Sequence, residues 1–186
     1  MKTRKLGIAL AATMLAAVPF ASFAQEAEDD YKPFSATLAA TSDYVWRGIS
    51  QTNEDPAFQA GVTYTSKVGI YAGAWTSNVD FGAGDPDWER DFNIGYNTDI
   101  GEHVNFDVMV NRYTYSGASD LNWNELITKT TFYKTYYVTL TYSNDSWATD
   151  ENGYYAGVGA NWSLPHDFTV GASYGRSMFS NKAGIE

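Results

Sequence analysis

From Phe34 onward the chain alternates apolar and polar residues with a period of two, the pattern of β-strands that have one apolar face. The alternation is clearest over 104–111, where four apolar residues interleave with Asn105, Asp107, Met109 and Asn111. Nine segments follow the pattern, with 123–132 the least regular. We predict strands over 34–46, 57–65, 68–77, 89–97, 104–111, 123–132, 136–142, 154–162 and 168–175.

The connections between these segments alternate in length. Short turns lie at 66–67, 99–103, 133–134 and 164–167, and long polar connections at 48–56, 78–88, 114–122 and 144–152. Bacterial outer-membrane barrels have short periplasmic turns and longer extracellular loops. The pattern therefore predicts an antiparallel transmembrane β-barrel with its N-terminus on the periplasmic side.

Aromatic residues stand at the ends of several apolar faces, and the chain as a whole is 16% aromatic. A membrane barrel has such rings at both interfaces with water, whereas a soluble sandwich has no reason to repeat them at strand ends. The pairs are Tyr44 and Trp46, Phe58 and Tyr64, Tyr136 and Tyr142, Tyr154 and Trp162, and Phe168 and Tyr174. We predict that they face lipid.

A barrel in lipid must close, because each unpaired backbone group costs several kcal/mol there. Nine strands is an odd number, whereas single-chain bacterial barrels have an even number. Residues 180–186 also lack the strand pattern. We therefore expect ten to twelve strands in a complete chain, with C-terminal strands missing from this sequence.

The N-terminus has the three parts of a secretory signal. Lys2, Arg4 and Lys5 precede an apolar run to about Phe20, and small residues end at Ala24. A membrane anchor is the alternative, but the run is short for a span of about 20 residues. We predict a signal peptide over 1–24, a short acidic periplasmic tail over 25–33 and an outer-membrane barrel over 34–186.

Charge narrows the range of partners. The formal net charge is −10, and cleavage of the signal would remove its three positive charges and leave −13. Nucleic-acid binding needs Lys and Arg to neutralise phosphates, so we expect no such partner. The chain has no cysteine and hence no disulfide. The expected partners are outer-membrane lipid and small polar solutes or ions.

Two stretches resemble a known family. They are residues 35–51 (SATLAATSDYVWRGISQ) and residues 69–75 (GIYAGAW) followed by 77–81 (SNVDF). They are similar to proteobacterial outer-membrane proteins of the TorF family of porins, and the resemblance covers roughly residues 34–180. It implies an outer-membrane β-barrel and a pore. Members of that family look longer than this chain, with further hairpins and a final strand that ends in an aromatic residue.

Catalytic chemistry is poorly represented. His103 and His166 both fall in short turns, away from the outer rim where a positioned base would be needed, so we predict no enzyme and no cofactor. Oxygen-rich loops can bind Ca²⁺, but none has a calcium-motif spacing, so solvated loops are favoured over a metal site. These acidic loop residues are Glu54, Asp55, Asp80, Asp85, Asp87, Glu89, Asp120, Asp145, Asp150 and Glu151.

The remaining candidates are charged residues on the inferred inner faces of the strands. Asp43 and Arg47 lie four apart and would form an inward ion pair or a constriction filter. The full set is Asp43, Arg47, Asp91, Asp107, Glu125 and Lys129, which is net negative. We therefore predict passive diffusion of small solutes with a mild cation preference. The alternative is a narrow, plugged barrel with a structural or adhesive role.

Overall fold

A computed structural model describes residues 31–82, 86–166 and 168–180, and the regular structure there is almost entirely β. The signal peptide predicted at 1–24 lies outside the described residues. One antiparallel sheet contains nine strands: β1 (Phe34–Thr41), β4 (Ala57–Thr65), β5 (Ile70–Asn78), β6 (Trp88–Ile100), β7 (Val104–Tyr115), β8 (Trp123–Phe132), β9 (Tyr136–Ser143), β10 (Gly153–Ser163) and β11 (Thr169–Phe179). A separate hairpin joins β2 (Val45–Trp46) to β3 (Ile49–Ser50), and two long connections contain the short 3₁₀ turns η1 (Ser119–Leu121) and η2 (Ser146–Ala148).

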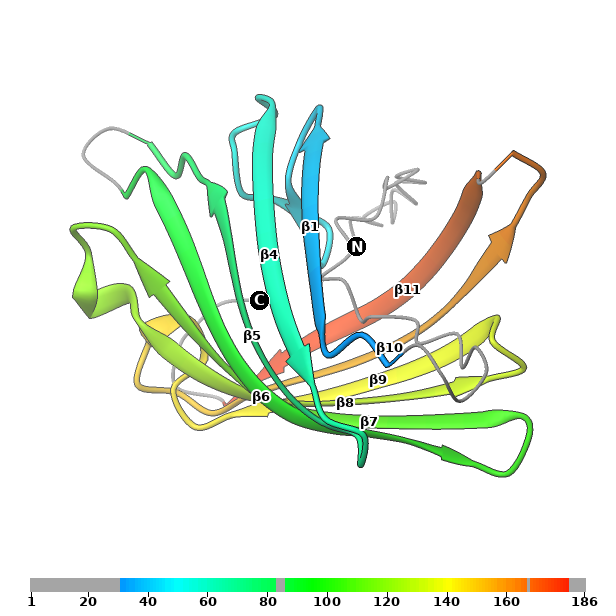
Figure 1. The fold of residues 1–186 in the computed structure, drawn as a ribbon. Coiled ribbons are helices and arrows are strands. Elements are labelled where there is room, and N and C mark those ends of the chain that lie inside the picture. The colour runs from blue at the N-terminus through cyan, green and yellow to red at the C-terminus, as the bar shows by residue number, and fades with distance from the viewer. Residues whose placement is uncertain (1–30, 83–85, 167, 181–186) are drawn as a thin grey trace, which may run out of the picture.

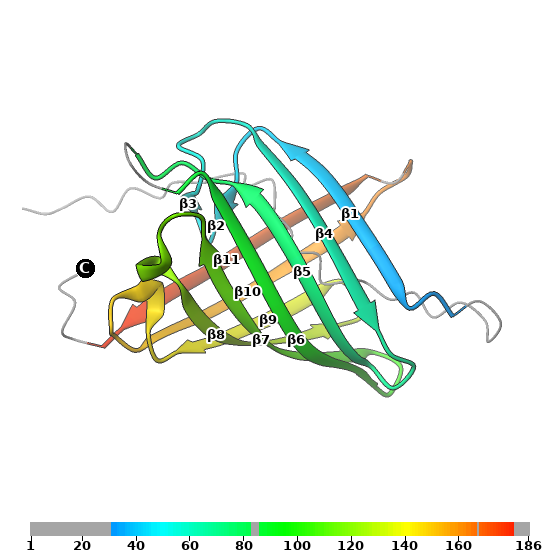
Figure 2. The same cartoon turned by 60° about the vertical axis from the view of Figure 1, so that its left-hand side comes forward.

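Each strand of the large sheet pairs with the next one along the chain, in the order β1-β4-β5-β6-β7-β8-β9-β10-β11. The sheet is strongly curved (Figure 1), and its strands run obliquely across it (Figure 2). The predicted alternation of short turns and long connections is confirmed. Within the described residues β1 and β11 do not pair, so the antiparallel sheet is established and closure into a barrel is not.

The sheet has inverted polarity. Its convex face is apolar: Leu38 is 88% exposed and Tyr174 78% exposed, while the outward residues of β6 are Phe92, Ile94 and Tyr96. The buried residues of the concave face include Glu89 and Glu125, which are 2% and 3% exposed. A protein folded in water places these residue classes the other way round. Among the described helices, none has the length and apolarity to cross a membrane.

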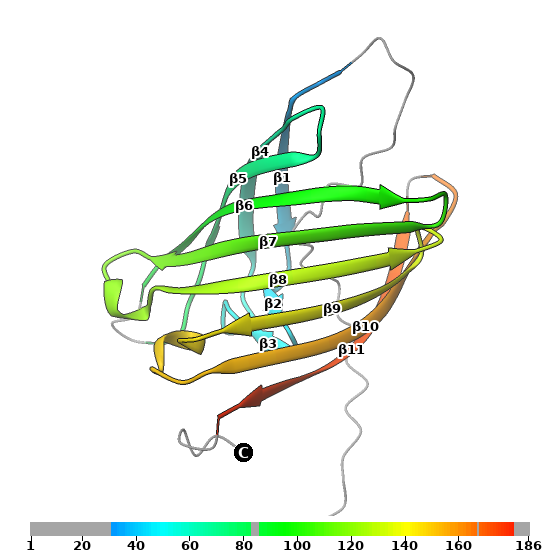
Figure 3. The same ribbon diagram turned by 90° about the horizontal axis from the view of Figure 1, so that it is seen from below.

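The first predicted strand is too long. The chain leaves the sheet after Thr41, and the β2–β3 hairpin lies on the concave side, visible behind β7 to β10 in Figure 3. Its two-residue turn places Arg47 and Gly48 at φ 49° and 86°, which matches the twist that favours tight hairpins. Asp43 holds the bend, because its Oδ1 accepts hydrogen bonds from Ser50 Oγ at 2.7 Å and Thr52 Oγ1 at 3.1 Å.

This bend overturns the lipid-facing assignment of the first aromatic pair. Tyr44 is only 3% exposed and Trp46 is half-buried, and both lie inside the curved sheet. The other predicted aromatic pairs are exposed, as expected: Phe58 and Tyr64, Tyr136 and Tyr142, Tyr154 and Trp162, and Phe168 and Tyr174.

Interior tyrosines lie over glycines of the same face. A Cβ added at Gly95 would meet the ring of Tyr71, its direct partner across β5 and β6. Tyr137 covers Gly159 in the same way, and Tyr155 covers Gly175. Glycine thus makes room for a flat ring, an arrangement that also helps to fix strand register. It explains why Tyr71 and Trp75 disturb the apolar–polar alternation of β5.

The ring of Tyr155 supplies all three of the nearest atoms to a Cβ added at Gly175. We therefore expect Gly175→Ala to destabilise the protein by about 1–3 kcal/mol, the usual cost of overpacking. The measurement is urea unfolding followed by tryptophan fluorescence. In a Tyr155→Leu background the added methyl group should cost much less, and an equal cost in both backgrounds would show that the ring is not the obstacle.

Candidate functional site

A buried ion pair anchors the hairpin to the concave wall. Arg47, in the β2–β3 turn, donates from Nη1 to Glu125 Oε1 and from Nη2 to Glu125 Oε2, both at 2.8 Å. Glu125 on β8 also accepts hydrogen bonds from Thr141 Oγ1 at 2.6 Å and Tyr113 Oη at 3.1 Å. Both carboxylate oxygens thus have donors, which a buried charge requires.

Aromatic rings surround the same guanidinium group. Its Cζ lies 4.1 Å from the ring centroid of Trp46 and 4.4 Å from that of Tyr155 on β10. Trp46 in turn meets Trp123 edge-on at 6.0 Å and Trp147 of η2 at 5.7 Å. The planar guanidinium suits this environment because it can stack and form paired hydrogen bonds together. The hairpin is therefore packed across the interior and does not project away from it.

A second polar cluster lies closer to the short-turn end of the sheet. Asp107 on β7 accepts hydrogen bonds from Tyr71 Oη at 2.8 Å and from Asn97 Nδ2 at 3.0 Å. It stands opposite Lys129 of β8, whose Nζ lies 4.5 Å from the ring centroid of Tyr137. This cluster combines one acidic and one basic residue on neighbouring strands of the inner wall.

Two acidic residues at the long-loop end are less completely paired. Glu89 and Asp91 lie two apart on the concave face of β6, and both are buried. Asp91 Oδ2 accepts from Asn111 Nδ2 at 2.9 Å. Asp91 Oδ1 and Glu89 Oε2, however, have no hydrogen-bond donor among the described residues. Two neighbouring buried carboxyl groups, each with one oxygen that lacks a donor, make this the most incompletely satisfied acidic part of the described wall.

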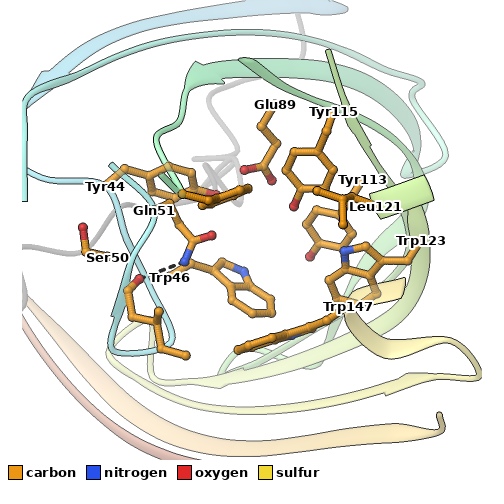
Figure 4. A pocket seen from close by; sticks show the side chains of 12 residues that line it. Tyr44, Trp46, Ser50, Gln51, Glu89, Tyr113, Tyr115, Leu121, Trp123 and Trp147 are labelled. Carbon is orange, nitrogen blue, oxygen red and sulfur yellow. Dashed lines mark hydrogen bonds between the residues drawn. The ribbon is translucent and has the colours of Figure 1, made fainter. Parts of the chain in front are cut away.

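Glu89 borders a cavity of about 250 Å³ (Figure 4). The walls come from the β2–β3 hairpin, the start of β6, the end of β7, the start of β8 and both 3₁₀ turns, and they are mostly aromatic. This cavity lies at the end of the sheet that carries the long connections. It is a concave site formed by residues from four stretches of the chain, 44–51, 81–89, 113–123 and Trp147.

The structure brings together most of the residues predicted for the lumen. Asp91, Asp107, Glu125 and Lys129 lie on concave faces of strands, and Arg47 reaches that face from the hairpin. The proposed ion pair of Asp43 with Arg47 is wrong, because Asp43 precedes β2 and is bonded to Ser50 and Thr52, whereas Arg47 lies in the β2–β3 turn and directs both terminal nitrogens to Glu125. Asp43 braces the loop, and Arg47 pairs instead with Glu125 across the interior.

Sequence reasoning missed other residues of the site. Glu89 was grouped with the acidic loops, yet it is the second residue of β6 and is buried. The signal was available, since Glu89 shares the parity of Asp91 on one strand. Tyr113 extends the inward parity of Asn111 in the same way. Trp147 could not have been found by parity, because it lies in a turn.

The histidines stand apart from this site. His103 stacks on Tyr133 in a neighbouring short turn, with 4.9 Å between ring centroids, and His166 is exposed in the β10–β11 turn. In the part of the chain that the structure describes, no group of three or more His, Cys, Asp or Glu residues could hold a metal ion.

Removing Arg47 should be costly. Arg47→Ala leaves Glu125 buried without its counter-charge, and we expect a loss of about 3–5 kcal/mol of unfolding free energy, as for other broken buried pairs. Urea unfolding measures this, and a shift of the tryptophan emission spectrum reports release of Trp46. Arg112→Ala, on the opposite face of β7, is the control and should cost far less. Similar losses for the two variants would contradict an anchoring role for Arg47.

Comparison with known proteins gives a family but no characterised relative. Neither the curated proteins nor the solved structures include a match to this chain. A bacterial family model matches residues 24–185, which includes the whole sheet and the hairpin inside it. The chain therefore belongs to the family described as "Bacterial protein of unknown function (Gcw_chp)".

Proposed function

We propose that this protein is an outer-membrane β-barrel that lets small solutes diffuse across the membrane, with a preference for cations. The observation that carries the proposal is the inverted polarity of the sheet. Its convex face presents many large apolar side chains, including Leu38, Ile94 and Leu140, and its concave face buries carboxylates. Lipid on one side and water on the other is the environment that suits this arrangement.

The ends of the strands support the same proposal. Exposed tyrosines and tryptophans lie close to both ends of the outward faces, for example Tyr154 and Trp162 on β10. Such rings favour the interface between lipid and water. Insertion also requires that β1 and β11 be paired, either with each other or with further strands, because lipid cannot satisfy their backbone groups. The resemblance to TorF-family porins supports the same reading.

The cation preference follows from the charges of the interior. Arg47 and Glu125 neutralise each other, and Lys129 stands opposite Asp107. Glu89 and Asp91 have no basic side chain paired with them in the described structure, so any charge that these two carboxyl groups carry is negative and is not neutralised by a neighbour. Rings of carboxylates attract cations, and surrounding low-dielectric material strengthens the effect.

A plugged barrel with a structural or adhesive role is the second candidate, and the hairpin favours it. Trp46 and Arg47 pack against β7, β8 and β10, so they occupy part of the interior. Barrel interiors include both water-filled channels and lumens closed by loops. Conductance in a planar bilayer separates the two functions, because a plugged barrel would insert and give no current.

Membrane insertion can be tested on neighbouring residues of one strand. Ile94, on the outward face of β6, is 61% exposed. In lipid vesicles Ile94→Arg should lower the unfolding free energy by about 2–4 kcal/mol, as basic residues do near the bilayer midplane. Asn93→Arg, which points to the interior, should cost much less. If Ile94→Arg proved harmless in vesicles, the convex face would not be in contact with lipid.

Selectivity can be tested with matched amide substitutions. Reversal potentials under a KCl gradient should show that K⁺ is preferred over Cl⁻ and that the preference weakens as salt rises. Asp107→Asn removes a wall charge and should reduce the preference. Asp145→Asn, in the β9–β10 connection, should have little effect because exposed charges are screened beyond about 8–10 Å. An anion-selective channel would overturn the proposed role of the wall charges.

A further inference from the structure

The cavity beside the hairpin has the walls of a cation-binding cage. Three tryptophans line it, Trp46, Trp123 and Trp147, together with tyrosines from β7 and from the bend before β2. Figure 4 shows these rings on several sides of one space. The negative faces of aromatic rings attract cations, most strongly when the cation is desolvated. A cavity of this composition therefore favours a cation that also has apolar surface.

Glu89 supplies the charge that such a ligand would complement. Its carboxylate is directed between the rings of Tyr44 and Tyr115 towards the cavity (Figure 4). The side chain is 2% exposed, and its Oε2 has no donor among the described residues. A buried carboxyl group with one oxygen that lacks a donor is incompletely satisfied, and a bound cation would complete its contacts.

The nearby arginine does not satisfy this charge. Arg47 directs both terminal nitrogens of its guanidinium group to Glu125, so its charge is already matched. Asp91, two residues from Glu89, adds a second carboxylate with one oxygen lacking a donor. The acidic groups beside the cavity therefore favour a cation over an anion.

The walls also discriminate between kinds of cation. A metal ion such as Ca²⁺ requires six to eight oxygen ligands, and the described residues include no suitable group of acidic residues or histidines. Aromatic carbon dominates the cavity instead. Its volume of about 250 Å³ lies below the roughly 300–1,000 Å³ of pockets for drug-sized ligands. The ligand that fits is therefore small, organic and positively charged.

We propose that this cavity binds a small organic cation of the quaternary ammonium class. The aromatic rings contact its alkyl groups, and Glu89 provides the counter-charge. The site lies at the end of the sheet with the long connections, where a solute approaching from that side arrives first. Binding here does not require conduction, so the inference stands or falls separately from the channel proposal.

The test compares a cation with its neutral analogue. Choline and 3,3-dimethylbutan-1-ol have nearly the same shape, but only choline is charged. The full chain is folded in a maltoside detergent, which has no ammonium head group, and is titrated by calorimetry and tryptophan fluorescence. We expect saturable binding of choline, at least about tenfold tighter than the neutral alcohol, which corresponds to about 1.4 kcal/mol. This comparison needs no variant.

Variants then locate the charge. Glu89→Gln should weaken choline binding by about tenfold and leave binding of the neutral alcohol unchanged. Asp120→Asn removes an exposed carboxylate from η1 and should leave both affinities unchanged. Trp123→Leu should weaken both ligands because it removes an aromatic wall.

Any one of four results would overturn the proposal. The first is no saturable binding of choline or tetramethylammonium. The second is equal affinity for choline and the neutral alcohol. The third is a Glu89→Gln variant, folded by fluorescence, that binds choline as tightly as the unsubstituted protein. The fourth is saturable binding of a neutral sugar in place of choline, which would show that the cavity binds a different class of ligand.

Discussion

The rest of the structure depends on one constraint, which is that a single curved sheet must keep its polar side chains on the inside. A carboxylate that is buried on this face is shielded from solvent by its neighbours and needs hydrogen-bond donors on adjacent strands or loops. Glu125 does so with Arg47, Thr141 and Tyr113, and Asp107 does so with Tyr71 and Asn97. Hydrogen bonds therefore organise much of the interior, alongside small apolar clusters such as that of Tyr71, Met109 and Ile127.

Much of this could be predicted from the sequence, because a strand has only two faces. Once Phe92, Ile94 and Tyr96 are assigned to one face of β6, Asp91 must lie on the other. The same parity argument places Asp107, Glu125 and Lys129 on the concave face of their strands. The presence of each strand, the length of each turn and the face on which each side chain lies all follow from this local period of two. Closure of the sheet does not, because it depends on pairing between segments far apart in the chain.

The hairpin was not predictable for a specific reason. Tyr44 and Trp46 maintain the period of two across the bend at Ser42, so the pattern continues where the strand does not. Arg-Gly is also not among the dipeptides that usually announce a two-residue turn. The partner of Arg47 lies 78 residues further along the chain, and no local pattern can identify it. The cavity could not be predicted from the sequence pattern either, because one of its walls, Trp147, lies in the connection between β9 and β10.

That long separation implies an order of assembly. The segment that contains Arg47 precedes most of the sheet in the chain, yet its binding surface is built from β7, β8, β9 and β10. A contact that spans so much chain closes a large loop, which is entropically unfavourable until the intervening strands are in place. We therefore expect the contact of Arg47 with Glu125 to form after the local strand pairs of the wall. When Arg47 pairs with Glu125, the β2–β3 hairpin packs against the concave face of the sheet and fills part of its interior.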